Sequence, residues 1–417
     1  MQQMNLQLTG KHIVLGLSGG IACYKSAELC RLLIKEGATV QVVMTESATH
    51  FITPTTMQAL SKRPVFDSQW DARNPASMAH IDLGREADAI VIAPCSADFL
   101  EKLAHGRADE LLSLLCLARP LHQTPLLIAP AMNREMWAHP ATQRNRVQVE
   151  ADDAIVLDVG VGEQACGETG DGRMLEPEDI VQDVIAFFQP KVLKGQHVLV
   201  SAGPTFEPID PVRGITNHSS GKMGFAIARA AQEAGAKVTL VAGPVALTTP
   251  RNVKRVNVQS ANDMLNAVLA HTKPEQEATI FIATAAVADW RPANTSNQKI
   301  KKEGNEKGST LPAMEFVENT DILATVAQSA RAQAGELFCV GFAAESHDLL
   351  TYARAKRIKK GIPLLVGNIG PATFGKDDNA LLLVDENGEK ELPHNSKLAL
   401  ARQLVREIAG RLNKIRQ

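Results

Sequence analysis

GQHVLVSAGPTFEPIDPVRGITNHSSGKMG, residues 195–224, is the stretch that decides how the chain is organised. It begins with an apolar strand, His197–Val200, continues through a loop rich in Gly, Pro and Ser, and reaches a helix start near Ser220. Free backbone N–H groups and the helix dipole at such a junction attract anions, and α/β proteins hold phosphate groups in this way. The stretch therefore predicts an α/β domain with an anion site after its first strand.

The same pattern occurs near the N-terminus. KHIVLGLSGG (11–20) is followed by EGATVQVVM (36–44), just as GQHVLVSAGP (195–204) is followed by AGAKVTLVAG (234–243). The loop of the second copy is the longer one, so the sequence indicates two α/β domains, the second with an enlarged loop that could hold a site. Further apolar strands alternate with helical stretches, which predicts parallel sheets covered by helices on both faces.

The boundary between the domains is predicted at about residue 190. EPEDIVQDVIAFFQP (176–190) has the pattern of an amphipathic helix that Pro190 ends, and the next strand begins soon after. We therefore expect domains over residues 1–190 and 191–417. A chain of 417 residues is long enough for two such domains, each with its own core.

Composition excludes several classes of protein. A net charge of −2 gives no support for nucleic-acid binding, and no apolar run has the length of a membrane span. The first residues lack the apolar core of a signal peptide. The six cysteines show no CxxC and no metal-ligand spacing, and all but Cys166 lie in apolar segments. These features predict a cytoplasmic protein with buried thiols that binds neither membrane nor nucleic acid.

Candidate site residues of the first half lie where strands end. Ser18-Gly19-Gly20, Thr45 and Ser96 each follow an apolar strand, where open parallel sheets bind ligands. The Ser-Gly-Gly turn is equally compatible with a phosphate site and with an ordinary tight turn. The second strand ends in Met44-Thr45, without the acidic residue that grips an adenosine ribose, which argues against NAD and for a mononucleotide such as FMN.

Three other groups of the first half have possible chemical roles. His80 and Asn133 each have a purely structural alternative role. His80 could be a core or capping histidine, and Asn133 could be a helix N-cap. Cys166 lies in GEQACGETGDGRM (162–174), whose glycines predict a mobile loop, and a thiol in such a loop favours a functional role.

The second half has its own candidates. Asn217 lies in the enlarged loop, and Asp289 follows the strand predicted at 278–283, where a ribose hydroxyl and a metal-bound phosphate are equally possible partners. Lys299 begins a KIKK run without apolar periodicity, which suits a flap that carries positive charge to a triphosphate. Lys356 and Lys360 share a helical face, where pairing with the helix dipole is an even alternative.

Several motifs, in this order, resemble a known family. GLSGGIACYK (16–25), AHIDLG (79–84), PAMNREMW (130–137) and ACGETGDGRM (165–174) are similar to flavin-containing cysteine decarboxylases. ITNHSSGKMG (215–224), AAVADW (285–290), KIKK (299–302) and GFAAES (341–346) resemble phosphopantothenate–cysteine ligases. Together they look like the bacterial bifunctional enzymes of coenzyme A biosynthesis. Cys95-Ser96 and Thr320 depart from the family pattern, in which Ala-Thr and a proline are more usual.

The resemblance implies an α/β fold of two Rossmann-like domains, a flavodoxin-like FMN-dependent decarboxylase and a doubly wound CTP-dependent ligase. In the decarboxylase, His80 would serve oxidation and decarboxylation, Asn133 would hold the substrate carboxylate, and Cys166 would donate a proton. FMN would contact the five candidates Ser18, Gly19, Gly20, Thr45 and Ser96.

In the ligase, the resemblance implies that Asn217 grips an acyl-cytidylate and that Lys299 stabilises charge during its formation. Mg²⁺ or Mn²⁺ is expected with CTP, although the sequence identifies no metal ligands. The family also implies trimers of the first domain, dimers of the second and possibly a dodecamer. The other residues expected to contact CTP or substrate are Ala285, Asp289, Asp321, Ile322, Phe342, Lys356 and Lys360.

Two alternatives belong to other classes. One is a pyridine-nucleotide oxidoreductase with two Rossmann-type domains, which a bound yellow chromophore and no response to NAD(P)H would exclude. The other is a flavin-binding regulatory or scaffold protein without turnover. The joint presence of His80, Asn133, Cys166, Asn217 and Lys299 favours an enzyme.

Overall fold

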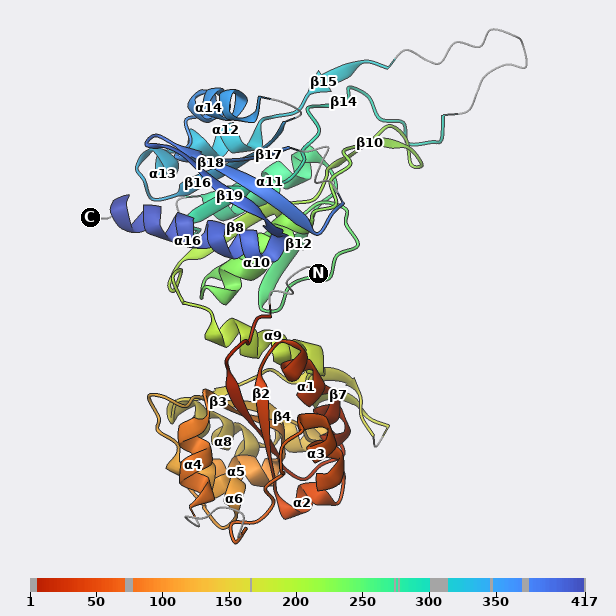
Figure 1. The fold of residues 1–417 in the computed structure, drawn as a ribbon. Coiled ribbons are helices and arrows are strands. Elements are labelled where there is room, and N and C mark those ends of the chain that lie inside the picture. The colour runs from red at the N-terminus through yellow and green to blue at the C-terminus, as the bar shows by residue number, and fades with distance from the viewer. Residues whose placement is uncertain are drawn as a thin grey trace. The chain divides into compact units, whose positions relative to one another are not determined.

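The computed structural model describes residues 6–71, 78–165, 167–273, 275–276, 278–300, 314–345, 348–369 and 375–415. The chain divides into two compact units, residues 1–188 and 189–417 (Figure 1). This division falls two residues before the boundary at 190 that the sequence predicts. Each unit is built around its own sheet.

The sheet of the first unit has five parallel strands in the order β2-β1-β3-β4-β5. This is the flavodoxin-like order, in which the switch point lies between β1 and β3. In the register, Leu15 of β1 lies opposite Val42 of β2 and Val91 of β3. The strands are β1 (His12–Leu17), β2 (Thr39–Met44), β3 (Ala89–Cys95), β4 (Leu126–Pro130) and β5 (Ala154–Val156).

Helices cover both faces of this sheet, as Figure 1 shows. The helices α1, α3 and α9 pack on one face and α4, α5, α6 and α8 on the other. Strand interiors are therefore buried on both sides, which explains why they read as continuous apolar runs. The helices are α1 (Cys23–Lys35), α2 (Glu46–Thr49), α3 (Pro54–Ser61), α4 (Ala79–Glu86), α5 (Ala97–His105), α6 (Leu111–Ala118), α7 (Arg134–Ala138), α8 (Pro140–Ala151) and α9 (Pro177–Phe188).

The stretch predicted as a glycine loop forms an antiparallel hairpin. Strand β6 (Gly160–Glu163) pairs with β7 (Thr169–Arg173), with Gly162 opposite Gly170. Its glycines and charged residues hide the alternation of a strand, and its pairing partner is local. The sequence therefore missed both strands.

The second unit contains a larger mixed sheet in the order β12-β11-β8-β13-β16-β17-β18-β19. The first six strands are parallel and have the doubly wound Rossmann order, with the switch point between β8 and β13. The two domains thus confirm the predicted fold class. These strands are β8 (His197–Ala202), β11 (Lys237–Ala242), β12 (Val253–Asn257), β13 (Ile280–Ala283), β16 (Phe338–Glu345) and β17 (Leu364–Ile369).

An antiparallel hairpin of β18 (Asp378–Asp385) and β19 (Gly388–Ser396) extends this sheet. Asp385 pairs with Gly388, so the two turn residues are Glu386 and Asn387. The helices of the unit are α10 (Lys222–Glu233), α11 (Ala261–Thr272), α12 (Ile322–Ala327), α13 (Ala330–Gln333), α14 (Leu349–Lys360) and α16 (Lys397–Ile415).

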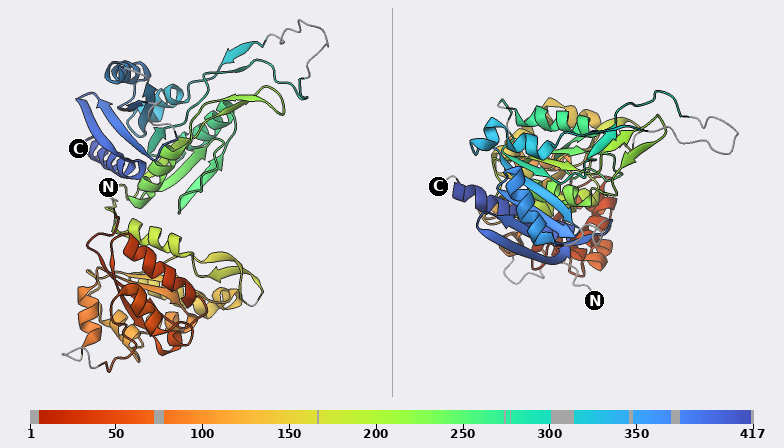
Figure 2. Two further views of the ribbon diagram at one scale, coloured as in Figure 1. Left: turned by 45° about the vertical axis from the view of Figure 1, so that its right-hand side comes forward. Right: turned by 90° about the horizontal axis from the view of Figure 1, so that it is seen from above.

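The enlarged loop between β8 and α10 contains a second small hairpin. Strand β9 (Phe206–Pro208) pairs there with β10 (Gly214–Thr216). A further two-stranded ribbon follows β13 in the sequence, where β14 (Trp290–Pro292) pairs with β15 (Phe316–Glu318). Both ribbons extend from the same side of the unit (Figures 1 and 2). Each strand has only three residues, too few to show a period in the sequence.

Candidate active sites

A cavity of about 700 Å³ lies in the first unit at the carboxyl ends of β1, β3 and β4. This is the switch point of the sheet, where α/β proteins bind their ligands. Gly19 and Gly20 follow β1, Ser96 follows β3, and Asn133 follows β4 at its edge. Side chains suited to a planar ring and an anion also line it, among them Tyr24, Lys25, Met132, Met136 and Arg173.

Hydroxyl groups join the loops after β1 and β3. The Ser18 hydroxyl donates to the carbonyl of Pro94 at 2.9 Å and accepts from the backbone N–H of Ser96 at 2.8 Å. The Ser96 hydroxyl caps α5 by accepting from Phe99 N at 3.1 Å. Gly19 approaches Ser47 so closely that an added Cβ would lie 2.5 Å from the Ser47 Cβ. The turn therefore requires glycine at this position.

Asn133 connects the end of β4 to the β6–β7 hairpin. Its Oδ1 caps α7 by accepting from Glu135 N at 2.8 Å, as predicted by the interpretation of Asn133 as a helix N-cap. Its Nδ2 donates to the Glu168 carboxylate at 2.6 Å and to Gln164 Oε1 at 3.3 Å. The amide of Asn133, a cavity-lining residue, thus caps a helix and holds a carboxylate.

Gln164 is a site residue that sequence reasoning missed. Its Oε1 accepts from Arg134 N at 3.0 Å, and its Nε2 donates to the carbonyl of Asp171 at 3.0 Å. The side chain thereby fixes the hairpin over the mouth of the cavity. Its place two residues before Cys166 was the only available signal, because a glutamine in a polar loop has no distinctive pattern.

Three predicted residues of this half do not line the cavity. His80 is half-buried on α4, which packs on the other side of the sheet from α1. Thr45 is buried and caps α2 by accepting from Ala48 N at 3.2 Å. Ser18 is buried behind the turn that it braces. Cys166 lies outside the described residues.

In the second unit, the loops after β8 and β13 are joined at the switch point. Ala286 donates its N–H to Gly203 O at 2.9 Å, and Thr205 Oγ1 accepts from Ala288 N at 3.0 Å. Asn217 reaches the same place, because its Nδ2 donates to the carbonyl of Ala286 at 2.9 Å. The predicted residues Asn217 and Ala285 thus come from segments that meet at one site.

The segment that carries Lys299 is anchored to the β9–β10 turn. Asp210 is buried, and its carboxylate accepts from Arg213 Nη2 at 2.5 Å and from Ile300 N at 3.1 Å. Arg213 also donates to the carbonyl of Ile300 at 2.9 Å. The hydrogen bond from Arg213, reinforced by backbone N–H groups, holds the pKa of Asp210 well below its usual range. Lys299 itself is exposed.

Lys360 pairs with one carboxylate and is influenced by the charge of a second. Lys360, near the end of α14, forms an ion pair with Asp321, which caps α12 by accepting from Ala324 N at 2.9 Å. Burial lowers the pKa of Lys360, and the neighbouring charge of Asp289 partly offsets this effect. The three predicted residues therefore share one electrostatic environment.

Three further predicted residues of this unit lie on α12, β16 and α14. Ile322 is buried in the core below α12, so only its backbone is available to a ligand. Phe342 is half-buried on β16 and packs against the sheet core, and Lys356 is half-buried on α14. Within the described ranges, His, Cys, Asp and Glu side chains form no group of three or more that could hold a metal ion.

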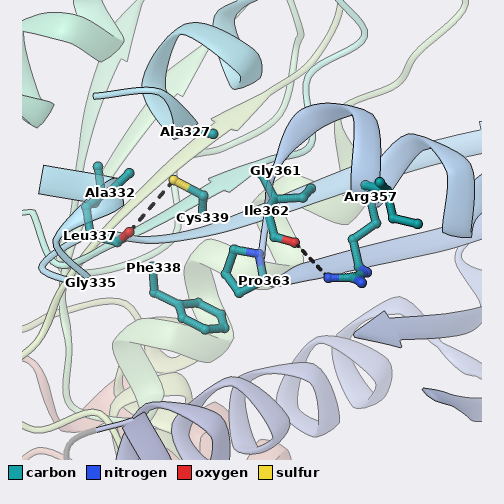
Figure 3. A pocket seen from close by; sticks show the side chains of 11 residues that line it. Ala327, Ala332, Gly335, Leu337, Phe338, Cys339, Arg357, Gly361, Ile362 and Pro363 are labelled. Atoms are coloured by element: carbon teal, nitrogen blue, oxygen red, sulfur yellow. Dashed lines mark hydrogen bonds between the residues drawn. The ribbon is translucent and has the colours of Figure 1, made fainter. Parts of the chain in front are cut away.

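A cavity of about 470 Å³ lies at the other end of this sheet, where β16 and β17 begin (Figure 3). The Arg357 guanidinium donates to the carbonyl of Ile362 at 3.4 Å, and the Cys339 thiol donates to that of Leu337 at 3.9 Å. These polar groups are bonded within the cavity wall. The cavity is also remote from the strand ends that carry Asn217 and Asp289, so we assign it no part in the site.

Comparison with known proteins follows the division into two units. The family model described as Flavoprotein matches residues 1–189. The model described as DNA/pantothenate metabolism flavoprotein C-terminal domain matches residues 193–412.

Relatives match almost the full length. The chain is 49% identical over 404 residues to the coenzyme A biosynthesis bifunctional protein CoaBC of Vibrio cholerae, covering 96% of this chain and 98% of that protein. It is 46% identical over 410 residues to the protein of the same name from Escherichia coli K12, covering 97% and 98%. The chain belongs to the coenzyme A biosynthesis bifunctional proteins. The Bacillus subtilis member is 41% identical over 411 residues, covering 97% and 98%.

Membership of this bifunctional family confirms the resemblance found in the sequence motifs. It makes the first unit a flavoprotein domain and the chain an enzyme of coenzyme A biosynthesis with ligase and decarboxylase activities. The roles of single residues stay predictions. In the part of the chain that the structure describes, no helix combines the length and the apolar character needed to cross a bilayer.

Proposed function

We propose that the chain makes 4′-phosphopantetheine in two consecutive reactions. The second unit joins 4′-phosphopantothenate to L-cysteine with CTP, and the first unit decarboxylates the product with FMN. The observation that carries the proposal is the full-length family match combined with two switch-point sites, one in each unit. The five described buried thiols fit a cytoplasmic enzyme.

Ligation requires activation of a carboxylate, because a carboxylate and an amine do not condense in water. The carboxylate oxygen of phosphopantothenate attacks the α-phosphorus of CTP, and the bond to the β-phosphate breaks to release pyrophosphate. The amine of cysteine then attacks the acyl carbon of the acyl-cytidylate and displaces CMP. Lys299 stabilises the departing pyrophosphate, and Asn217 holds the acyl-cytidylate by neutral hydrogen bonds.

The nucleotide would lie beyond β13 and β16. Lys360 and Lys356 supply positive charge, and Ala285, Ile322 and Phe342 supply backbone and ring contacts. Asp289 and Asp321 are suited to Mg²⁺ or Mn²⁺, since such ions are commonly held by one or two carboxylates together with substrate phosphates. A metal ion held in this way does not need a cluster of three or more protein ligands.

The cavity of the first unit suits FMN in volume, in its ring-covering side chains and in the backbone N–H groups after β1 and β3. When bound, FMN supplies the acceptor and later the donor of a hydride equivalent at the thiol-bearing carbon. Gly19, Gly20 and Ser96 would hold its phosphate, and Ser18 and Thr45 would brace the loops behind. Asn133 already holds the Glu168 carboxylate, and the substrate carboxylate would replace it.

Decarboxylation also needs groups that handle protons. Cys166, which falls between β6 and β7 in the sequence, donates the proton that completes reduction, and His80 serves the earlier steps. Because His80 does not line the Asn133 cavity of its own chain, a second copy would bring its histidine to the site. We therefore propose trimers of the first unit, together with dimers of the second and a dodecamer that combines both.

The test is incubation of the full chain with 4′-phosphopantothenate, cysteine, CTP and Mg²⁺, followed by mass analysis. We expect 4′-phosphopantetheine, CMP, pyrophosphate and CO₂, and flavin absorption near 450 nm. Accumulation of 4′-phosphopantothenoylcysteine alone would refute the decarboxylase assignment. A yellow protein that yields no product at all would instead be a flavin-binding scaffold.

A further inference from the structure

A second cavity of the first unit lies at the opposite end of the sheet from the flavin cavity. It encloses about 420 Å³ between α5, α6 and α8, and Leu126 and Ala154, the first residues of β4 and β5, form part of its wall. Leucines line much of the rest, and Leu117 and Leu121 are 59% and 56% exposed at its mouth. None of the residues assigned to ligation or decarboxylation lies here.

Arg119 carries an unpartnered charge in this cavity. The residue follows the last turn of α6, is only 7% exposed, and its Nε is fully buried without a hydrogen-bond partner. Across the described ranges, its guanidinium makes neither an ion pair nor a hydrogen bond. Burial lowers the pKa of Arg119, because the cost of removing its charge from water is only partly offset by the nearby charges.

The other cations of the cavity are already paired. Arg107 contacts Asp109 at 2.7 Å, and Lys102 contacts Glu110 at 2.8 Å and Asp109 at 3.2 Å. The cavity of Figure 3 gives the same contrast, since its Arg357 bonds to a carbonyl of the cavity wall. Of these two cavities, the Arg119 cavity is therefore the one that contains a buried guanidinium without a partner. Its planar group of donors matches a carboxylate or a phosphate.

The charges at the rim distinguish between these anions. Asp152 and Asp153 also line the cavity and are exposed, and their carboxylates lie near enough to favour the charged form of Arg119. They would repel a phosphate dianion but attract an ammonium group. The cavity thus has one cation inside, two carboxylates at its rim and apolar walls. This combination fits a zwitterion with an apolar part.

We propose that this cavity binds an α-amino acid with an apolar side chain. Its carboxylate accepts hydrogen bonds from Arg119, its ammonium group faces Asp152 and Asp153, and its side chain lies against the leucines of the wall. The site is separate from both active sites, so it goes beyond the proposed function and does not depend on it.

The test is calorimetric titration of the full-length protein with leucine as the probe. We expect saturable binding, weaker binding of 4-methylpentanoate, which lacks the ammonium group, and none of 3-methylbutylamine or inorganic phosphate. Arg119→Met should weaken leucine binding by about tenfold to a hundredfold. Arg107→Met, in the same cavity but paired with Asp109, should bind leucine as the wild type does. Phosphate binding tighter than leucine, or no saturable binding of leucine, would overturn the proposal.

A stability measurement distinguishes the remaining outcomes. If the guanidinium is unpartnered, Arg119→Met without ligand should melt at the same temperature as the wild type or above it, because a desolvated charge has been removed. A clear loss of thermal stability would instead show that Arg119 pairs with Asp152 or Asp153. A smaller assembly mass for Arg119→Met, with no amino acid bound by the wild type, would show that a second copy supplies the carboxylate. Either result would refute the amino-acid site.

Discussion

Asn217 and Lys299 approach the proposed ligation site from differently anchored segments. Asn217 is tied by its amide to the loop after β13, which is itself bonded to the loop after β8. Lys299 is exposed, and its neighbour Ile300 bonds to Asp210. A fixed amide suits the binding of an intermediate, whereas an exposed lysine suits the stabilisation of a departing charge.

Lys299→Gln and Asn217→Asp should therefore fail at different steps. Loss of the lysine should slow pyrophosphate release by about 10²–10³-fold, the usual effect of removing one electrostatic group. Asn217→Asp should still release pyrophosphate but form little amide, because its negative charge lies beside the phosphate of the acyl-cytidylate. The measurement is pyrophosphate release without cysteine, together with mass detection of the acyl-cytidylate.

Lys254→Gln is the matched control for the lysine, since Lys254 is exposed on β12. It should leave pyrophosphate release unchanged. If Asn217→Asp blocks pyrophosphate release as completely as Lys299→Gln, the division of roles is wrong, and Asn217 belongs to the binding of CTP or substrate.

Single residues were predictable where a strand end pointed to them. Asn133, Ser96 and Asn217 follow strands or open helices, and the structure places all three at loops that meet a switch point. Gln164 was not predictable, because its function depends on the carbonyl groups and amides that the fold brings to it. The orientation of a polar side chain in a short hairpin leaves no pattern in the sequence.

At the scale of elements, the side chain of Gln164 fixes the β6–β7 hairpin over the mouth of the flavin cavity. Gln164 bonds to the residues after β4 and also to the opposite strand of its own hairpin. Each of these hydrogen bonds contributes about 0.5–1.5 kcal/mol. Their loss should loosen the hairpin without disturbing the sheet.

Gln164→Ala should accelerate amide hydrogen exchange over residues 160–173 and weaken retention of FMN. Gln148→Ala, which removes an exposed amide of α8, should change neither quantity. Both are measured on the full chain, by exchange with mass detection and by flavin fluorescence after dilution. Unchanged exchange in Gln164→Ala would show that backbone pairing alone fixes the hairpin.

The β9–β10 turn depends on the charge of Asp210. Since the Arg213 hydrogen bond lowers its pKa, the carboxylate stabilises the fold at every pH above its ordinary value of about 3.9, and this contribution is lost only in stronger acid. Asp210→Asn should therefore lower thermal stability by an amount that is constant from pH 5 to pH 8. It should also raise the KM for CTP, because the Lys299 segment loses its anchor.

Melting curves of both proteins at several pH values, with CTP kinetics at neutral pH, test this prediction. A difference in melting temperature that has already vanished at pH 5 would show that the pKa of Asp210 is not lowered. An unchanged KM for CTP in Asp210→Asn would show that the β9–β10 turn does not contribute to CTP binding.

At the scale of the whole molecule, the two units have separate cores. The apolar clusters of residues 8–185 and 193–412 share no member. The sequence predicted this division because a complete strand–loop–helix–strand pattern begins twice. It did not predict the strand orders, which depend on long-range pairing, or the antiparallel position of β18 and β19 within the larger sheet.

Expression of residues 1–188 and 189–417 as separate proteins should give two folded fragments. The first should be yellow and the second should release pyrophosphate from CTP in the presence of phosphopantothenate. A fragment of residues 1–175 is the control, because it lacks α9, whose Ile180 and Val184 are fully buried. A colourless but folded 1–188 fragment, judged by circular dichroism and absorption, would contradict the assignment of the flavin site.

The continuity of each unit along the chain has a consequence for biosynthesis. Every strand of the five-stranded sheet, and the α9 helix that closes its core, is translated before the first strand of the second sheet. Domains generally fold as units as they leave the ribosome, the N-terminal one first. The flavin cavity can therefore be complete, and can capture its cofactor, while the ribosome is still synthesising the ligase.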